Sequence, residues 1–117
     1  MKTKPTSIQS LFSTKQGRSW QDCGSYQVVI EWQGEATAYK FPWFASLIRL
    51  VEAVDVEAML ESASPDLEIL CPCGTSKVYI LSVQEVIEFK ELLYGTRFAI
   101  SLNSMLHSQL YRAYQFA

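Results

Sequence analysis

Residues 26–44, YQVVIEWQGEATAYKFPWF, carry the pattern that decides the fold. In the first seven of these residues apolar and polar side chains alternate, which predicts a β-strand with one buried face. Gly34 then allows the positive φ of a tight turn, and residues 35–41 alternate again. Pro42 follows, and proline is favoured at the first position of a helix. The stretch predicts a β-hairpin followed directly by a helix.

A second unit with the same order of elements is expected at residues 67–95. Two short strands and a turn lead to Ser82, which is followed three residues later by a glutamate, the spacing of a helix capping box. Gly95 is the expected end of that helix. A short extended segment at residues 97–100 and a C-terminal helix over about residues 101–115 complete the chain.

The two units, about residues 26–61 and 67–95, predict an α+β fold: two β-hairpin–helix units forming one antiparallel sheet with helices on one face, plus a C-terminal helix. An isolated hairpin is only marginally stable in water, so both hairpins are expected to join one four-stranded sheet.

The N-terminal residues 1–19 are rich in Ser, Thr, Gln and Lys. They are expected to form a flexible or loosely docked arm, with one helical turn at Ile8, Leu11 and Phe12 if the arm docks. Residues 20–117 then form a single α+β domain, which fits a chain of 117 residues.

The composition limits the compartment and the partners. The formal net charge is −2 and the isoelectric point about 5.3, which argues against a nucleic-acid partner. No apolar run has the length of a membrane span and no signal peptide is recognised, so we expect a cytoplasmic protein without a membrane partner. Three cysteines do not form a disulfide framework, in agreement with a reducing compartment.

Charge is unevenly distributed along the chain. Residues 26–95 contain four basic and eleven acidic residues, whereas residues 96–117 contain Arg97 and Arg112 and no acidic residue. One interpretation is a solvated surface with polar ends. The other is that a basic end meets the acidic body or an acidic partner.

The three cysteines support an alternative function as a small metal-binding or thiol redox protein that uses Cys23, Cys71 and Cys73. A structural zinc site takes four nitrogen or sulfur ligands, and His107 is the only imidazole. Because the fourth ligand is unplaced and the Cys-x-Cys spacing is tighter than usual, we expect no cofactor, with zinc as the alternative. Otherwise Cys71 is a core residue and Cys73 a turn residue.

No catalytic constellation is present in the sequence, and we expect the protein not to be an enzyme. His107 has no acidic residue nearby in sequence, and no phosphate loop, dinucleotide-binding or nucleophile-elbow motif occurs. Glu85, Glu88 and Glu91 are better explained as a solvated helix face than as a cation site.

A resemblance is carried by Cys23-Gly24, by Cys71-Pro72-Cys73 and by the helix start Leu81-Ser82-Val83-Gln84-Glu85. In this order the chain resembles, over about residues 20–100, a family of small uncharacterised bacterial proteins that carry a domain of unknown function. The chain departs from that family by having a single cysteine in its first half. The resemblance implies no activity.

Aromatic residues are concentrated around the first hairpin and helix, and such residues are enriched at contact hot spots. The residues predicted to bind a partner are Trp32, Trp43, Phe44 and Tyr39, and the alternative for them is core packing. We therefore expect a non-enzymatic protein-interaction or regulatory module that binds a protein partner or forms a homodimer. Trp32 or Trp43 is expected at the contact.

Overall fold

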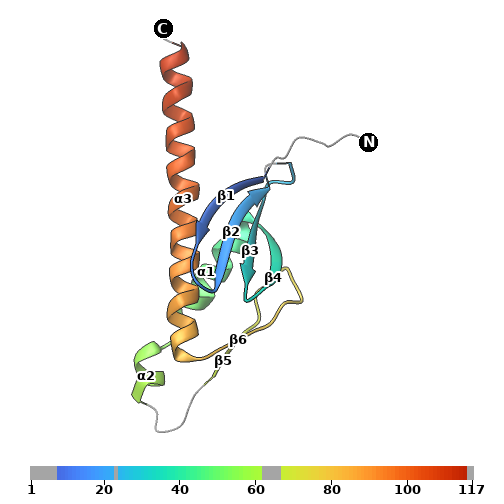
Figure 1. Cartoon of the computed structure of the whole chain (residues 1–117), viewed down its shortest axis with the longest axis vertical. Helices are drawn as coiled ribbons and strands as arrows, with labels where there is room; N and C mark the ends of the chain where they lie inside the picture. The colour runs from blue at the N-terminus through green and yellow to red at the C-terminus, as the bar shows by residue number, and fades with distance from the viewer. Residues whose placement is uncertain (1–7, 23, 62–66, 116–117) are drawn as a thin grey trace.

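Four consecutive strands form one antiparallel sheet, and helices cover one of its faces (Figure 1). The structure, a computed structural model, describes residues 8–22, 24–61 and 67–115, with side chains as far as residue 105. The sheet consists of β1 (Ile8–Ser13), β2 (Gly17–Asp22), β3 (Gln27–Trp32) and β4 (Glu35–Lys40). The elements that follow are α1 (Phe41–Glu52), α2 (Val56–Glu61), β5 (Glu68–Leu70), β6 (Tyr79–Leu81) and α3 (Val83–Gln115).

The predicted first hairpin and helix are confirmed. A two-residue turn joins β3 to β4, and both of its residues have positive φ, 53° at Gln33 and 88° at Gly34, as a hairpin turn of this length favours. Pro42 lies in the first turn of α1. Alternation along β3 buries every second side chain on the side where α1 and α3 pack. The buried residues of β3 and α1 are Val28, Ile30, Trp32, Phe44, Leu47, Ile48 and Val51.

The predicted capping box at the start of α3 is also confirmed. The backbone N–H of Ser82 donates to Glu85 Oε1 at 2.9 Å, and the backbone N–H of Glu85 donates to Ser82 Oγ at 3.3 Å. These reciprocal bonds satisfy two donors at the helix start. Together with the backbone N–H of Ser82, the amide of Gln33 lowers the pKa of the Glu85 carboxyl.

The α+β class and a four-stranded antiparallel sheet with helices on one face are confirmed, but the strands differ from those expected. All four come from residues 8–40, and the second hairpin forms a separate two-stranded ribbon of β5 and β6. Each strand of that ribbon has only three residues, and Pro72, shortly after β5, cannot donate to a ladder. The two hairpins therefore do not share a sheet.

Residues 8–19, expected to be a flexible or loosely docked arm, instead form β1 and the first half of β2. No helical turn is present at Ile8, Leu11 and Phe12; the register shifts between Ser10 and Phe12, a bulge in β1. Leu11 and Phe12 pack against the core while Ile8 is exposed. Residues 1–7 lie outside the described residues.

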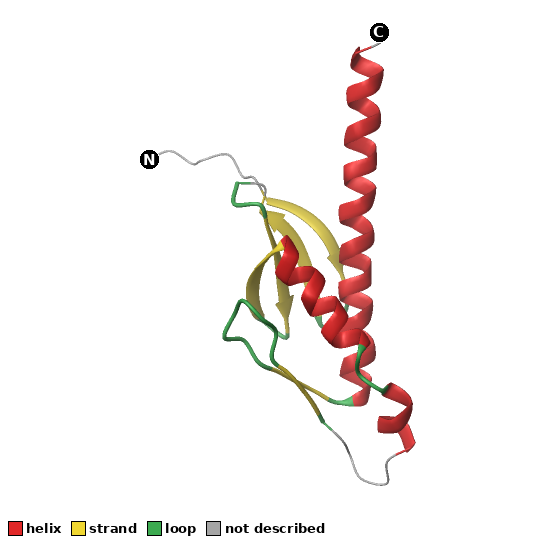
Figure 2. Cartoon of the chain, turned by 180° about the vertical axis from the view of Figure 1, so that it is seen from behind, coloured by secondary structure: helices red, strands yellow, loops and turns green. Residues whose placement is uncertain are grey.

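The C-terminal region is one long helix. Gly95 does not end α3, and the extended segment expected at residues 97–100 is helical, so the helix expected at 101–115 is the end of α3. A Cβ at Gly95 would overlap the ring of Phe12. The glycine therefore allows β1 to pack closely on α3 and does not end the helix. Figure 2 shows the C-terminal half of α3 continuing well beyond the sheet and the other helices.

Candidate functional site

The N-terminal half of α3 is anchored in the core. The ring of Phe89 lies edge-on to Trp32, with ring centroids 5.0 Å apart, and 4.7 Å from the ring of Tyr79. The hydroxyls of Ser19 and Thr96 lie 2.5 Å apart, and Thr96 donates to the carbonyl of Leu92 at 2.7 Å. Because both hydroxyls are buried, this contact fixes which side of α3 faces the sheet.

The side of α3 that faces away from the sheet carries a line of residues that we call the outer seam. They follow one another at intervals of three or four residues, which places them within about 80° of arc on a helix of 3.6 residues per turn. The described members of the outer seam are Ile87, Glu91, Tyr94, Phe98, Leu102 and Met105. In sequence the same intervals continue to Gln109 and Arg112.

Large apolar side chains of the outer seam are open to solvent. Phe98 is 67% exposed and Met105 60%, and Ile87 and Leu102 are also exposed. Soluble monomers rarely leave a contiguous line of such side chains uncovered. The outer seam is therefore the strongest candidate for a contact surface on this chain.

Tyr94 links the outer seam to α1. Its hydroxyl donates to a carboxylate oxygen of Glu52 at 2.8 Å, and the Arg97 guanidinium lies 5.0 Å from the centre of its ring. The hydrogen bond to Glu52 raises the pKa of the Tyr94 hydroxyl. These contacts join α3 at Tyr94 to Glu52, the last residue of α1.

The two ends of α3 carry opposite charge. Up to Thr96 the helix contains three glutamates and one lysine, and after Thr96 it contains Arg97 and Arg112 and no acidic residue. Glu88 accepts a hydrogen bond from Gln16 at 2.5 Å, whereas Glu91 is exposed. Because one half of the helix is acidic and the other is basic, α3 is electrostatically complementary to α3 of a second copy that runs in the opposite direction.

A second apolar surface lies on the β5–β6 ribbon. Ile69 and Ile80 are cross-strand partners, and both point away from the core, whereas Leu70, Tyr79 and Leu81 point into it. Leu67 and Val78 are exposed as well. Nothing in the described residues indicates what covers this face.

Two of the hollows at the surface of the described residues are an apolar groove and a polar hollow. A groove of about 220 Å³ between α1 and α3 is lined by apolar residues such as Phe41, Ile48 and Ile100, but it is smaller than a typical small-molecule site. A polar hollow beside the turns of the β1–β2 and β3–β4 hairpins contains Lys15 and Arg18. Arg18 is already paired there with Glu31, at 3.0 Å.

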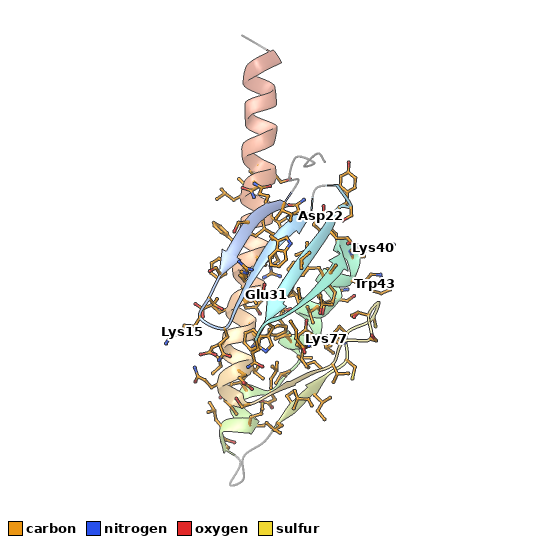
Figure 3. All side chains as sticks on the ribbon, turned by 45° about the vertical axis from the view of Figure 1, so that its right-hand side comes forward. Lys15, Asp22, Glu31, Lys40, Trp43 and Lys77 are labelled. Carbon is orange, nitrogen blue, oxygen red and sulfur yellow. The ribbon has the colours of Figure 1, made fainter. Side chains whose placement is uncertain are left out.

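The predicted partner-binding residues separate into two groups. Trp32, Tyr39 and Phe44 are buried in the core, so their side chains are not available to a partner. Trp43 is 41% exposed and packs on the turn at Gly74, where a Cβ would lie 2.8 Å from its ring. Figure 3 shows Trp43 at the edge of the molecule near Lys40 and away from α3.

Two of the three cysteines proposed for a metal-binding or thiol redox function lie within the described residues. Cys71 and Cys73 are both free and exposed, so Cys71 is not the core residue considered for it, and Cys23 lies outside the described part of the chain. Where the structure describes side chains, no group of three His, Cys, Asp or Glu residues is placed to hold a metal ion. His107 belongs to the part of α3 whose side chains are not described.

The sequence contained a signal for the outer seam that the predicted helix boundaries concealed. Leu102 and Met105 lie within the C-terminal helix that the sequence predicts over about residues 101–115, but Phe98 was assigned to an extended segment. Once Gly95 is allowed inside the helix, the spacing from Ile87 to Met105 is continuous.

No protein-family model, curated protein or solved structure matches the chain. The resemblance drawn from the cysteine and helix-cap motifs therefore stays a prediction. Among the described residues, none of the helices combines the length and apolar character that crossing a membrane requires.

Proposed function

We propose that the chain is a non-enzymatic protein-interaction module that associates with a second copy of itself through the outer seam of α3. The observation that carries the proposal is the exposure of four apolar side chains of the outer seam on a helix that continues beyond the domain body (Figure 2): Ile87, Phe98, Leu102 and Met105. Burying such side chains against another helix removes apolar surface from water, which is the main driving force of association.

The projecting part of α3 supports the same proposal. After Ile100, the helix has no core residue of its own chain among the described side chains. Helices without tertiary contacts are only marginally stable in water, and this part contains several serines and an asparagine, which are not strong helix formers. A second helix packed on the outer seam would supply the missing contacts.

A second copy is favoured over an unrelated protein because both complementary charges belong to this chain. The body is acidic over residues 26–95, and the last part of the chain is basic. Two copies can therefore satisfy each other without another partner.

The test is sedimentation equilibrium of the full chain over a wide range of concentrations. We expect a monomer–dimer equilibrium for the wild type and a monomer for Phe98→Ser. The matched control is Leu60→Ser, because Leu60 on α2 is similarly exposed but does not lie on α3. It should leave the equilibrium unchanged.

A wild type that stays monomeric at the highest soluble concentration would contradict the proposal. So would a dimer that Phe98→Ser leaves intact, because the contact would then lie elsewhere.

A further inference from the structure

We infer that the two copies pair through antiparallel α3 helices, in the register that sets Phe98 of one copy opposite Met105 of the other. The inference rests on the proposed self-association and adds to it the direction, the register and a charged contact. The charges along α3 and the spacing of the outer seam determine it.

Direction follows from charge. In a parallel pair the basic ends would lie side by side, and so would the acidic halves, so each charged residue of α3 would lie beside a like charge of the other copy. In an antiparallel pair the basic end of each helix lies beside the acidic half of the other. Helix macrodipoles also favour the antiparallel arrangement.

Register follows from the spacing of the outer seam. Phe98 and Met105 are its most exposed apolar members, and pairing one with the other forms two equivalent aromatic–thioether contacts, with Leu102 between them. Glu91 precedes Phe98 by seven residues, and Arg112 follows Met105 by seven. The same register therefore sets position 91 of each copy opposite position 112 of the other.

The shape of the chain allows this arrangement. The sheet, α1, α2 and the ribbon all lie beside the N-terminal half of α3, whereas the C-terminal half extends past them (Figures 1 and 2). An antiparallel pair places the two domain bodies at opposite ends of the helix pair. Each projecting helix end then lies along the outer seam of the other copy.

Charge reversal at the two positions tests direction and register together. Glu91→Arg and Arg112→Glu each replace two attractive contacts per dimer with two repulsive ones, and we expect each to raise the dimer dissociation constant about tenfold. The double variant Glu91→Arg/Arg112→Glu exchanges the charges and should restore the wild-type value. The differences should shrink at high salt. Lys40→Glu is the matched control, because it reverses an exposed charge at the end of β4.

The outcomes separate the inference from the proposed function. In a parallel dimer each reversed residue meets its own copy, a like charge before and after the change, so the single variants would leave association unchanged. Unchanged single variants, with association still abolished by Phe98→Ser, would overturn the antiparallel register and leave self-association standing. A monomeric wild type would overturn both. Weakened single variants and a restored double variant support the register.

Discussion

The two halves of α3 are one continuous helix, but different contacts support them. The first half, up to Thr96, buries Val86, Phe89 and Leu92 against the sheet and its neighbours. The second half begins with exposed Arg97 and Phe98 and leaves the domain body (Figure 1).

Two phenylalanines of α3 show the difference between its halves most clearly. Phe89 is 0% exposed and Phe98, nine positions later, is 67% exposed. Both are phenylalanines on one helix, so the difference lies in what their surroundings offer. Phe89 stabilises the fold of its own chain, whereas the side chain of Phe98 can become buried only by contact with another chain.

The largest expected effect is at Phe89. Phe89→Ala should lower the free energy of unfolding by about 3–5 kcal/mol, because it leaves a cavity beneath Trp32 and Tyr79. Phe98→Ala should change it by less than about 0.5 kcal/mol in the monomer, as exposed sites usually do. Urea denaturation at low protein concentration measures both, and similar losses at the two sites would remove the distinction between the halves.

Gly95 lies at the boundary between the halves. Gly95→Ala should cost about 1–3 kcal/mol, since the added methyl overlaps the Phe12 ring and displaces β1. In a Phe12→Ala background the same change should instead be neutral or stabilising, because alanine is the better helix former. A double-mutant cycle by thermal or urea unfolding measures this reversal, and an equal cost in both backgrounds would show that Phe12 is not the obstacle.

The core beneath the first half of α3 contains a buried tyrosine pair whose hydroxyls lie 2.7 Å apart, Tyr39 and Tyr79. Burial raises the pKa of both phenols. The stability that the neutral pair contributes is therefore fully present below the unfolded pKa of about 10. Above that pH the free energy of unfolding should fall by up to about 1.4 kcal/mol per pH unit for each phenol.

The matched control for the pH effect is Tyr39→Phe/Tyr79→Phe, which removes both phenols while keeping the rings. Unfolding followed between neutral and alkaline pH should show a shallower decline for this variant than for the wild type. Parallel curves would show that other groups cause the alkaline loss.

A small effect is expected at Trp43, an exposed aromatic residue away from α3. Trp43→Ala should cost about 1 kcal/mol of folding stability, because its ring covers the turn at Gly74. It should leave self-association unchanged, in contrast to Phe98→Ser. Sedimentation equilibrium of Trp43→Ala is the check, and weakened association would return Trp43 to the contact surface expected from the sequence.

The hairpin and helix over residues 26–52 were predictable because local signals agree there. The alternation of β3, the turn at Gly34 and the proline of α1 all indicate the same structure. The capping box at Ser82 was predictable for the same reason, since its two hydrogen bonds connect residues only three apart.

The strands β1 and β2 were not predictable, because long-range contacts stabilise them. Ser19 is polar, but its hydroxyl can be buried because it forms a hydrogen bond with the hydroxyl of Thr96, which lies 77 positions away in the sequence. The prediction that Gly95 ends a helix was wrong for a similar reason. Its lack of a side chain allows a close contact with Phe12 of β1, which is distant in the sequence.

The candidate site could be predicted only in part. Aromatic composition indicated contact residues, but Trp32, Tyr39 and Phe44 were needed to fill the core of a small domain. The spacing of Leu102 and Met105 was visible in the sequence. Their significance depends on the continuous helix that links them to Ile87.

Amide hydrogen exchange along α3 at low and high protein concentration tests the central claim most directly. We expect the first half, up to Thr96, to be protected at both concentrations, and the helix from Arg97 onward to gain protection as dimers form. Phe98→Ser should remove that gain and leave the first half protected. Protection after Thr96 that depends neither on concentration nor on Phe98 would contradict self-association through the outer seam.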